Sequence, residues 1–171
     1  MSSITPSEVG SFFLTLVVPI AIGAASAGIT AYLALNRFYR EKWWEKKHTA
    51  YNLLIDKLIE LKDIYRHASN IGEMEWEADQ GLRSPPLGRV DWNKLQELSA
   101  QVHRLHILSP ISFGNKASEL LNGFFEKDSE ITFSIYEEGY PDFVAYSDLA
   151  ALLDELIIEI VKDAKQELRF S

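Results

Sequence analysis

Residues 9–36 read VGSFFLTLVVPIAIGAASAGITAYLALN, and this stretch decides the fold class because it contains no charged residue. A hydrocarbon core about 30 Å thick is crossed by roughly 20 helical residues. In lipid the backbone must satisfy its own hydrogen bonds, which a helix does within one segment. The sequence therefore predicts an N-terminal transmembrane helix at 9–36, apolar from about Phe12 to Leu35 and loosened in its first turns by Pro19.

Two other interpretations of this stretch stay open. A buried helix of a soluble protein is also apolar, although few such helices run this far without a charge. Ala25-Ser26-Ala27 fits the pattern of a signal-peptidase site, which would leave a secreted protein beginning at Gly28. The preceding segment is acidic, and the stretch exceeds the roughly 7–15 apolar residues of a signal peptide, so an uncleaved span is favoured.

Basic and aromatic residues follow the apolar stretch. Residues 1–8 contain no Lys or Arg, whereas five bases lie within 37–47. Because cytoplasmic flanks are rich in Lys and Arg, we expect residues 1–8 to form a short external segment and everything after 36 to be cytoplasmic. Aromatic and basic side chains together suit the headgroup layer. The predicted membrane-interface residues are Arg37, Arg40, Lys42, Trp43, Trp44, Lys46 and Lys47.

Small residues are dense in the second half of the predicted span. Gly23 and Ala27, and likewise Ala24 and Gly28, are four positions apart, a spacing that lets two helix backbones approach closely. Glycine is also generally frequent in membrane helices. These four residues are therefore a candidate helix–helix contact, through which two copies of the chain could associate.

Helical periodicity continues beyond the span. Apolar residues recur at steps of three, four or seven, as in one stripe of an amphipathic or coiled-coil helix. Asn70 and Gly72 are suitable terminating residues, so we expect a juxtamembrane amphipathic helix at 37–72. Its stripe consists of Trp44, Tyr51, Leu54, Leu58, Leu61, Tyr65 and Ala68.

Residues 73–90 are expected to form an acidic loop rich in Pro and Gly. Acids alternate with other residues at its start, and oxygen ligands at alternate positions can surround a calcium ion. The full calcium-loop spacing is absent, so a solvated loop is the favoured interpretation. The alternating acids are Glu73, Glu75, Glu77 and Asp79.

The remainder, 91–171, reads as further helices. Asp91 can cap a helix that stops before Pro110, and a second helix is expected at 115–137. Residues 131–136 also alternate as a strand would, which leaves their state open. After a break at 139–141, a last helix is expected from Ser147 or Asp148. The predicted fold is all-α, with an N-terminal transmembrane helix continuing into a small cytoplasmic up-down helical bundle.

Charge is segregated along the cytoplasmic part. Residues 37–62 carry seven bases and four acids, a net charge of +3, whereas 63–171 carry ten bases and twenty acids, a net charge of −10. The basic segment should be attracted to an anionic leaflet and the acidic remainder repelled from it. Nucleic acid is excluded as a partner because its binding needs basic patches on the domain.

No catalytic motif appears in the sequence. The chain has no cysteine, which excludes thiolate catalysis and disulfides, and phosphate-binding and nucleophile-elbow motifs are absent. His103 and His106 share a helix face and could bind a metal together with His67 or a nearby acid, but two surface or partly buried histidines are the favoured interpretation. We therefore predict a domain without enzymatic activity, cofactor or metal.

The junction resembles that of a known group of proteins. Residues 42–47 read KWWEKK and are followed by Ala50-Tyr51 and an amphipathic helix. In this respect the chain resembles a group of uncharacterised bacterial proteins with one N-terminal transmembrane helix and a small helical cytoplasmic domain. The resemblance implies a location in the bacterial inner membrane.

Two functional hypotheses follow from these patterns. The first is a single-pass, membrane-anchored helical interaction module that binds a protein partner or a second copy of itself at the cytoplasmic face. The alternative is an oligomerising membrane effector, similar to a toxin, whose assembled spans perturb the bilayer. An enzyme is the third and least supported hypothesis.

Overall fold

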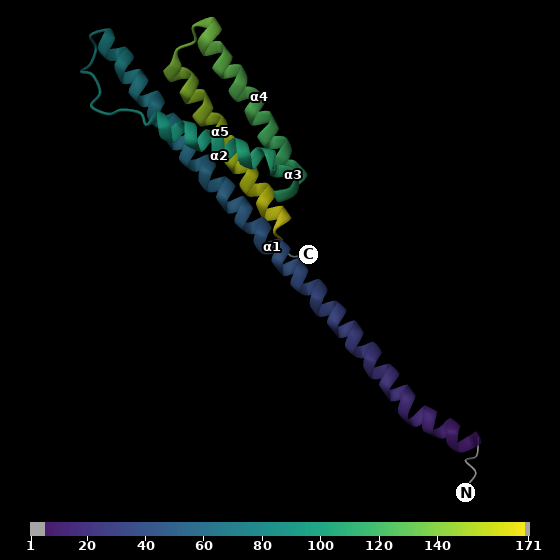
Figure 1. Ribbon diagram of the computed structural model, residues 1–171. Coiled ribbons are helices and arrows are strands. Elements are labelled where there is room, and N and C mark those ends of the chain that lie inside the picture. Colours follow the sequence, from purple (N-terminus) through teal and green to yellow (C-terminus); the bar gives the residue numbers. More distant parts are fainter. Residues whose placement is uncertain (1–5, 170–171) are drawn as a thin grey trace. The chain divides into compact units, whose positions relative to one another are not determined.

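The computed structural model describes residues 6–169, and helices make up 87% of the protein (Figure 1). No described residue lies in a strand, which confirms the prediction of an all-α protein. Residues 131–136, whose state the sequence left open, are helical. The elements are α1 (Pro6–Asp79), α2 (Trp92–Ile107), α3 (Ser109–Ser112), α4 (Asn115–Glu138) and α5 (Asp142–Glu167).

The chain divides into two units, an N-terminal unit that extends to Glu45 and a C-terminal unit that begins at Lys46. Helix α1 contributes to both. It includes one stretch, near the N-terminus, that is long and apolar enough to cross a membrane, and the rest of the described chain buries none of it. Of the predicted external segment 1–8, residues 1–5 lie outside the described residues and 6–8 already belong to α1.

Within the C-terminal unit, α1 and α5 pack side by side and antiparallel. Lys62, midway along the part of α1 in this unit, pairs with Asp154, while Tyr65 further along α1 stacks on Tyr146 near the start of α5, with ring centroids 6.0 Å apart. The predicted stripe faces this contact, which confirms the periodicity. Its residues Tyr51, Leu54, Leu58, Leu61, Tyr65 and Ala68 are all buried, whereas Trp44, the first residue of the predicted stripe, is only half-buried.

The predicted helix end at Gly72 is wrong, because α1 continues to Asp79. Gly72 has a packing role instead: a Cβ there would lie 2.8 Å from the Cβ of Phe143 on α5. The helix ends where Gly81 adopts a positive φ of 73°. The Gly81 amide bonds to Ala78 O and the Leu82 amide to Glu77 O, which together form a Schellman cap. The connecting loop is therefore 80–91, shorter than the predicted 73–90.

Helix α2 begins as the sequence predicts, since the Asp91 carboxylate accepts a 3.0 Å hydrogen bond from the Lys94 amide. It ends at Ile107, before Pro110, and Pro110 then lies in the first turn of the short helix α3, which the sequence did not indicate. Leu98 and Val102 are the buried residues through which α2 packs into the common core. The core thus draws on α1, α2, α4 and α5.

Helices α4 and α5 are antiparallel and joined by a turn in which Gly139 has a φ of 68°. The start of α5 was predicted five or six residues too late, because the helix begins at Asp142. Residues in its first turns pack on the far end of α1: Phe143 lies against Gly72 and Trp76, and Ala145 is fully buried. Tertiary packing, not local periodicity, therefore determines where α5 begins.

Candidate interaction site

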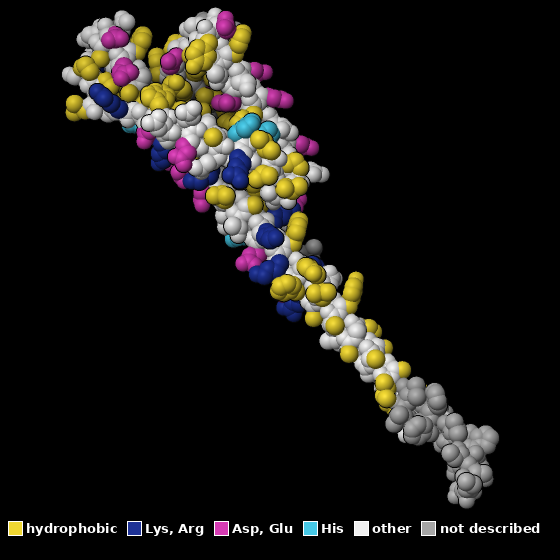
Figure 2. All heavy atoms as spheres, viewed as in Figure 1, with side chains coloured by type: hydrophobic (Ala, Val, Ile, Leu, Met, Phe, Trp, Pro, Cys, Tyr) yellow, Lys and Arg dark blue, Asp and Glu magenta, His cyan; other side chains and the backbone are white. Residues whose placement is uncertain are grey.

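The described side chains of the apolar stretch in α1 are exposed along the N-terminal unit (Figure 2). Two of its hydroxyl groups are hydrogen-bonded within the helix: Ser26 Oγ donates to Ile22 O and Thr30 Oγ1 donates to Ser26 O, each at 2.8 Å. A polar side chain paired in this way leaves no orphan donor when it is placed in hydrocarbon. The described part of the stretch thus presents apolar side chains outward, and the hydroxyls of Ser26 and Thr30 are paired within the helix.

The predicted helix–helix contact is open on the N-terminal unit. A Cβ added at Gly23 or Gly28 would meet nothing within 4 Å apart from the adjacent residues and the backbone of its own helix, and Ala24 and Ala27 are exposed. No other described part of this chain occupies the small-residue face. Space for a second helix is therefore available there.

Two of the predicted interface bases already have acidic partners on the same helix. Arg37 Nε lies 2.9 Å from Glu41 Oε1 and Lys42 Nζ lies 2.7 Å from Glu45 Oε2. Such exposed pairs are worth little, because water screens them, so both bases remain accessible to headgroups. The remaining predicted interface residues on the N-terminal unit are the exposed Arg40 and Trp43 and the half-buried Trp44.

Lys46 and Lys47, at the start of the C-terminal unit, differ in their surroundings. Lys46 is exposed, whereas Lys47 is buried and its ammonium donates a hydrogen bond to the Glu167 carboxylate of α5. The prediction that Lys47 faces lipid headgroups is therefore wrong. A run of bases shows only where positive charge gathers, and Lys47 lies on the side of α1 that packs on α5.

Beside this ion pair lies a buried polar cluster around Tyr51. The Tyr51 hydroxyl donates a 2.7 Å hydrogen bond to Asp163 Oδ2 and accepts a 3.0 Å bond from the Gly114 amide, which begins α4. Burial, together with the bond to Asp163, raises the pKa of Tyr51 well above its usual value. One phenol thus links α1, α4 and α5 at the end of the unit where α1 enters.

Asp154 of α5 forms a second link to α1. Its two carboxylate oxygens accept from Lys62 Nζ at 2.8 Å and Arg66 Nη2 at 2.7 Å. The hydrogen bond from Lys62 is the main reason why the pKa of Asp154 lies below its usual value. This link is more exposed than the one at Tyr51, so it fixes the register of the helices more than it stabilises them.

The histidine pair of α2 has a structural environment. His103 and His106 pack on Phe125 of α4, with ring centroids 5.2 Å and 4.8 Å apart, and a ring nitrogen of His106 bonds to the Asn122 side chain. Among the residues that the structure describes, no three His, Asp or Glu side chains are grouped as a metal site would require. The pair therefore joins α2 to α4.

The alternating acids at 73–79 lie on α1 and not in a loop. Residues two apart on a helix point to nearly opposite sides, so Glu73 and Glu75 diverge and cannot surround one cation. Glu77 instead pairs with Arg83 at 3.3 Å. The calcium interpretation is thereby wrong for this segment.

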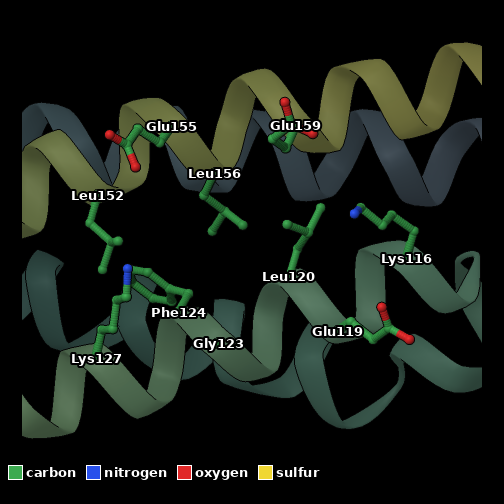
Figure 3. Close-up of a pocket in the computed structure, with 10 residues that line it drawn as sticks. All are labelled: Lys116, Glu119, Leu120, Gly123, Phe124, Lys127, Leu152, Glu155, Leu156 and Glu159. Atoms are coloured by element: carbon green, nitrogen blue, oxygen red, sulfur yellow. The ribbon is translucent and has the colours of Figure 1, made fainter.

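A groove of about 300 Å³ runs between α4 and α5 on the C-terminal unit (Figure 3). Apolar side chains from both helices point into it, and charged side chains line its two margins. Basic residues rise from α4 toward α5, while the α5 margin is acidic. The apolar lining is Leu120, Phe124, Leu152 and Leu156, and the charged residues at the margins are Lys116, Glu119 and Lys127 on α4 and Glu155 and Glu159 on α5.

The charges on these margins are largely unused within the chain. Among the described residues, Lys116, Lys127 and Glu155 form no ion pair, and Glu159 has only a 3.6 Å contact with Lys162. The groove keeps the α4 bases and the α5 acids on opposite sides. A groove with an apolar floor between margins of opposite charge has the composition expected of a surface that binds another helix.

Comparisons with protein-family models, with curated proteins and with solved structures find no match for this chain. The groove was not predicted from the sequence. Its apolar residues have the same helical spacing as the core residues beside them, so periodicity cannot distinguish the two. The available indication was Gly123, a glycine inside a helix far from either end.

Proposed function

We propose that the chain is a single-pass membrane protein that presents a helical interaction module on the cytoplasmic side. The span is the apolar part of α1, the N-terminal end lies outside, and the membrane is the bacterial inner membrane. The C-terminal unit is an up-down bundle that acts by binding protein. The single observation that carries the anchoring is the exposed, charge-free stretch, in which Ser26 and Thr30 pair their hydroxyls with the backbone of the same helix.

The binding role is supported by the groove between α4 and α5. Its apolar floor favours contact with a partner's apolar side chains, and its separated charges favour one orientation over others. The exposed bases Arg37, Arg40 and Lys42 add attraction to anionic headgroups, by roughly 1 kcal/mol per nearby base before the neighbouring acids are subtracted. Together these features support a module that is held at the membrane while it binds protein.

The anchoring is tested by fractionation of cells that produce the protein with a C-terminal tag. The full-length tagged chain should stay in the membrane pellet after alkaline carbonate extraction. A shortened soluble product would contradict the proposal and support cleavage after Ala27.

The orientation is tested by cysteine labelling, since the natural chain contains no cysteine. Single variants Ser3→Cys and Gln80→Cys are exposed to a membrane-impermeant maleimide on intact cells. Labelling of Ser3→Cys but not of Gln80→Cys is expected. The reverse pattern would invert the topology.

The second candidate function is an oligomerising membrane effector, and the open face at Gly23 and Gly28 favours it. Leakage of a dye from cells or vesicles that contain the protein, abolished in the variant Gly23→Leu/Gly28→Leu, would support it. Intact membranes at the same expression level would support the interaction module instead.

A further inference from the structure

We propose that the surface around the groove between α4 and α5 packs on the same surface of a second copy of the chain. The two copies are related by a two-fold axis that runs along the groove, so that α4 of each copy lies over α5 of the other. This inference rests on the proposed function, because it names the partner of that module.

Gly123 indicates that something outside the chain approaches this surface. It lies inside α4 and lines the groove, and glycine there destabilises a helix relative to alanine. At Gly72 a glycine is required by packing within the chain, since a Cβ there would meet Phe143 at 2.8 Å. At Gly123, by contrast, a Cβ would meet nothing within 4 Å. The space that the missing side chain leaves is open toward the outside.

The charge layout identifies a second copy as that approaching element. Lys127 lies across the groove from Glu155, while Lys116 lies beyond Glu159 along the groove and its side chain leans back toward it (Figure 3). A two-fold rotation about the groove direction exchanges the two margins and preserves position along the groove. It therefore places Lys127 of one copy over Glu155 of the other and brings the Lys116 ammonium close to Glu159, twice in each dimer.

The other face-to-face axis, perpendicular to the groove, gives the opposite result. It would place the acidic α5 margins over each other and the α4 bases over each other, which is repulsive. It would also point the two copies in opposite directions. The axis along the groove keeps the Lys46 ends of both C-terminal units together, which is the arrangement that two anchors in one membrane require.

The contact is limited in extent. Glu119, which also lines the groove on α4, would face the acidic α5 margin of the other copy, and beyond Lys127 the acids Glu130 and Asp148 would face each other. Pairing is thus confined to the segment between Lys116 and Lys127 on α4. A small interface of this kind is weak in solution, but confinement of both copies to one membrane raises their effective concentration.

The decisive experiment reverses each margin separately in the full-length protein. One variant carries Lys116→Glu and Lys127→Glu, and the other carries Glu155→Lys and Glu159→Lys. Differently labelled copies are reconstituted in vesicles of neutral lipid, and proximity is read by energy transfer between C-terminal fluorophores. Neutral lipid prevents the altered charges from acting through headgroups.

Each variant alone should lose at least about threefold in energy transfer, because like margins then face each other. A mixture of the two variants should regain the wild-type signal, because both contacts are again between opposite charges. No loss in the single variants, or no recovery in the mixture, would overturn the pairing. Far-ultraviolet circular dichroism confirms that each variant is folded.

Gly123→Ala provides an independent test in which stability and association move in opposite directions. The melting temperature should rise by about 2–4 °C, while energy transfer should fall. Ser129→Ala, on an exposed position of the same helix, is the matched control and should leave energy transfer unchanged. An unchanged signal in Gly123→Ala would show that no second copy approaches this glycine.

Cross-linking identifies the axis. In the cysteine-free chain, copies with Lys116→Cys should be joined by a short bis-maleimide to copies with Glu159→Cys. Joining of Lys116→Cys copies to one another instead would indicate the perpendicular axis and overturn the proposal.

The outcomes separate this inference from the proposed function. A protein that is extracted as a membrane protein with the expected labelling, but shows wild-type energy transfer in every groove variant, refutes the groove dimer alone. If Gly23→Leu/Gly28→Leu then abolishes energy transfer, the copies associate through their spans. A soluble product refutes the membrane-anchored module itself.

Discussion

The Tyr51 hydroxyl and the Asp163 carboxylate, 112 positions apart in the chain, are joined by a 2.7 Å hydrogen bond at the end of the C-terminal unit where α1 enters. Tyr51 is fully buried and Asp163 is 5% exposed. A buried carboxylate is tolerated only when its oxygens are hydrogen-bonded. The relationship therefore stabilises the packing of α1 on α5 at this end, and the Gly114 amide extends it to α4.

Replacing Tyr51 by Phe should destabilise the C-terminal unit by about 1.5–3 kcal/mol, because the change leaves a buried carboxylate and a buried amide without their partner. Thermal melting of the full-length protein in detergent measures the loss. Tyr140→Phe is the matched control, since Tyr140 also donates to an aspartate, Asp148, but at an exposed position. The control should change stability by less than about 0.5 kcal/mol. Equal losses of stability in the two variants would show that the buried Tyr51 hydrogen bonds contribute no more than the exposed one at Tyr140.

Gly72→Ala should be destabilising by about 1–3 kcal/mol, although alanine is the better helix former. The added Cβ would lie 2.8 Å from the Cβ of Phe143, and both atoms are close to backbone, so the two helices must move apart. Differential scanning calorimetry should show a lower melting temperature. Stabilisation by this substitution would contradict the close packing of α1 on the start of α5.

Asp128→Asn should raise the melting temperature at neutral pH by about 1–3 °C. Burial raises the pKa of Asp128, so the folded protein disfavours the ionised carboxylate. This destabilisation is present when pH lies above the raised pKa, and it is relieved as pH falls through that value. The gain in the variant should therefore shrink in acid. Glu126→Gln, an exposed position on the same helix, should show neither effect.

Trypsin should cut the native protein first in the loop 80–91, after Arg83 or Arg89, which are exposed and lie outside helices. The two fragments should remain together on a sizing column in detergent, because residues 46–79 of α1 belong to the same core as α2, α4 and α5. A variant with Arg83→Gln and Arg89→Gln should resist the cut. Fragments that separate without denaturant would contradict the shared core.

The features of this fold that depend on composition or periodicity were predictable from the sequence. The charge-free stretch predicts a long exposed apolar helix, and the stripe from Tyr51 to Ala68 predicts the face that is buried. The Asp91 cap is likewise a local feature, because its hydrogen bond joins neighbouring residues. Such elements need no knowledge of what lies elsewhere in the chain.

The errors have a common physical origin in contacts between distant residues. Gly72 indicates a helix end unless Phe143 is known to lie against it, and Lys47 indicates an interface base unless Glu167 is known to pair with it. The groove was missed for the opposite reason. Leu120 and Leu152 have the helical spacing of core residues, but they line an open groove. A sequence pattern indicates which residues can form contacts, but it does not identify the distant residues that they contact.

The role of α1 in the core has a consequence for gene architecture. Because residues 46–79 supply much of the buried surface, the domain has no natural boundary between α1 and the rest. A water-soluble version should begin at or before Lys46, and a fragment that starts at Asp91 would expose the faces of α2, α4 and α5 that α1 covers. Recombination that exchanged the membrane segment would have to join the sequences upstream of Lys46 to preserve the fold. The domain can therefore be moved to another anchor only together with residues 46–79 of α1.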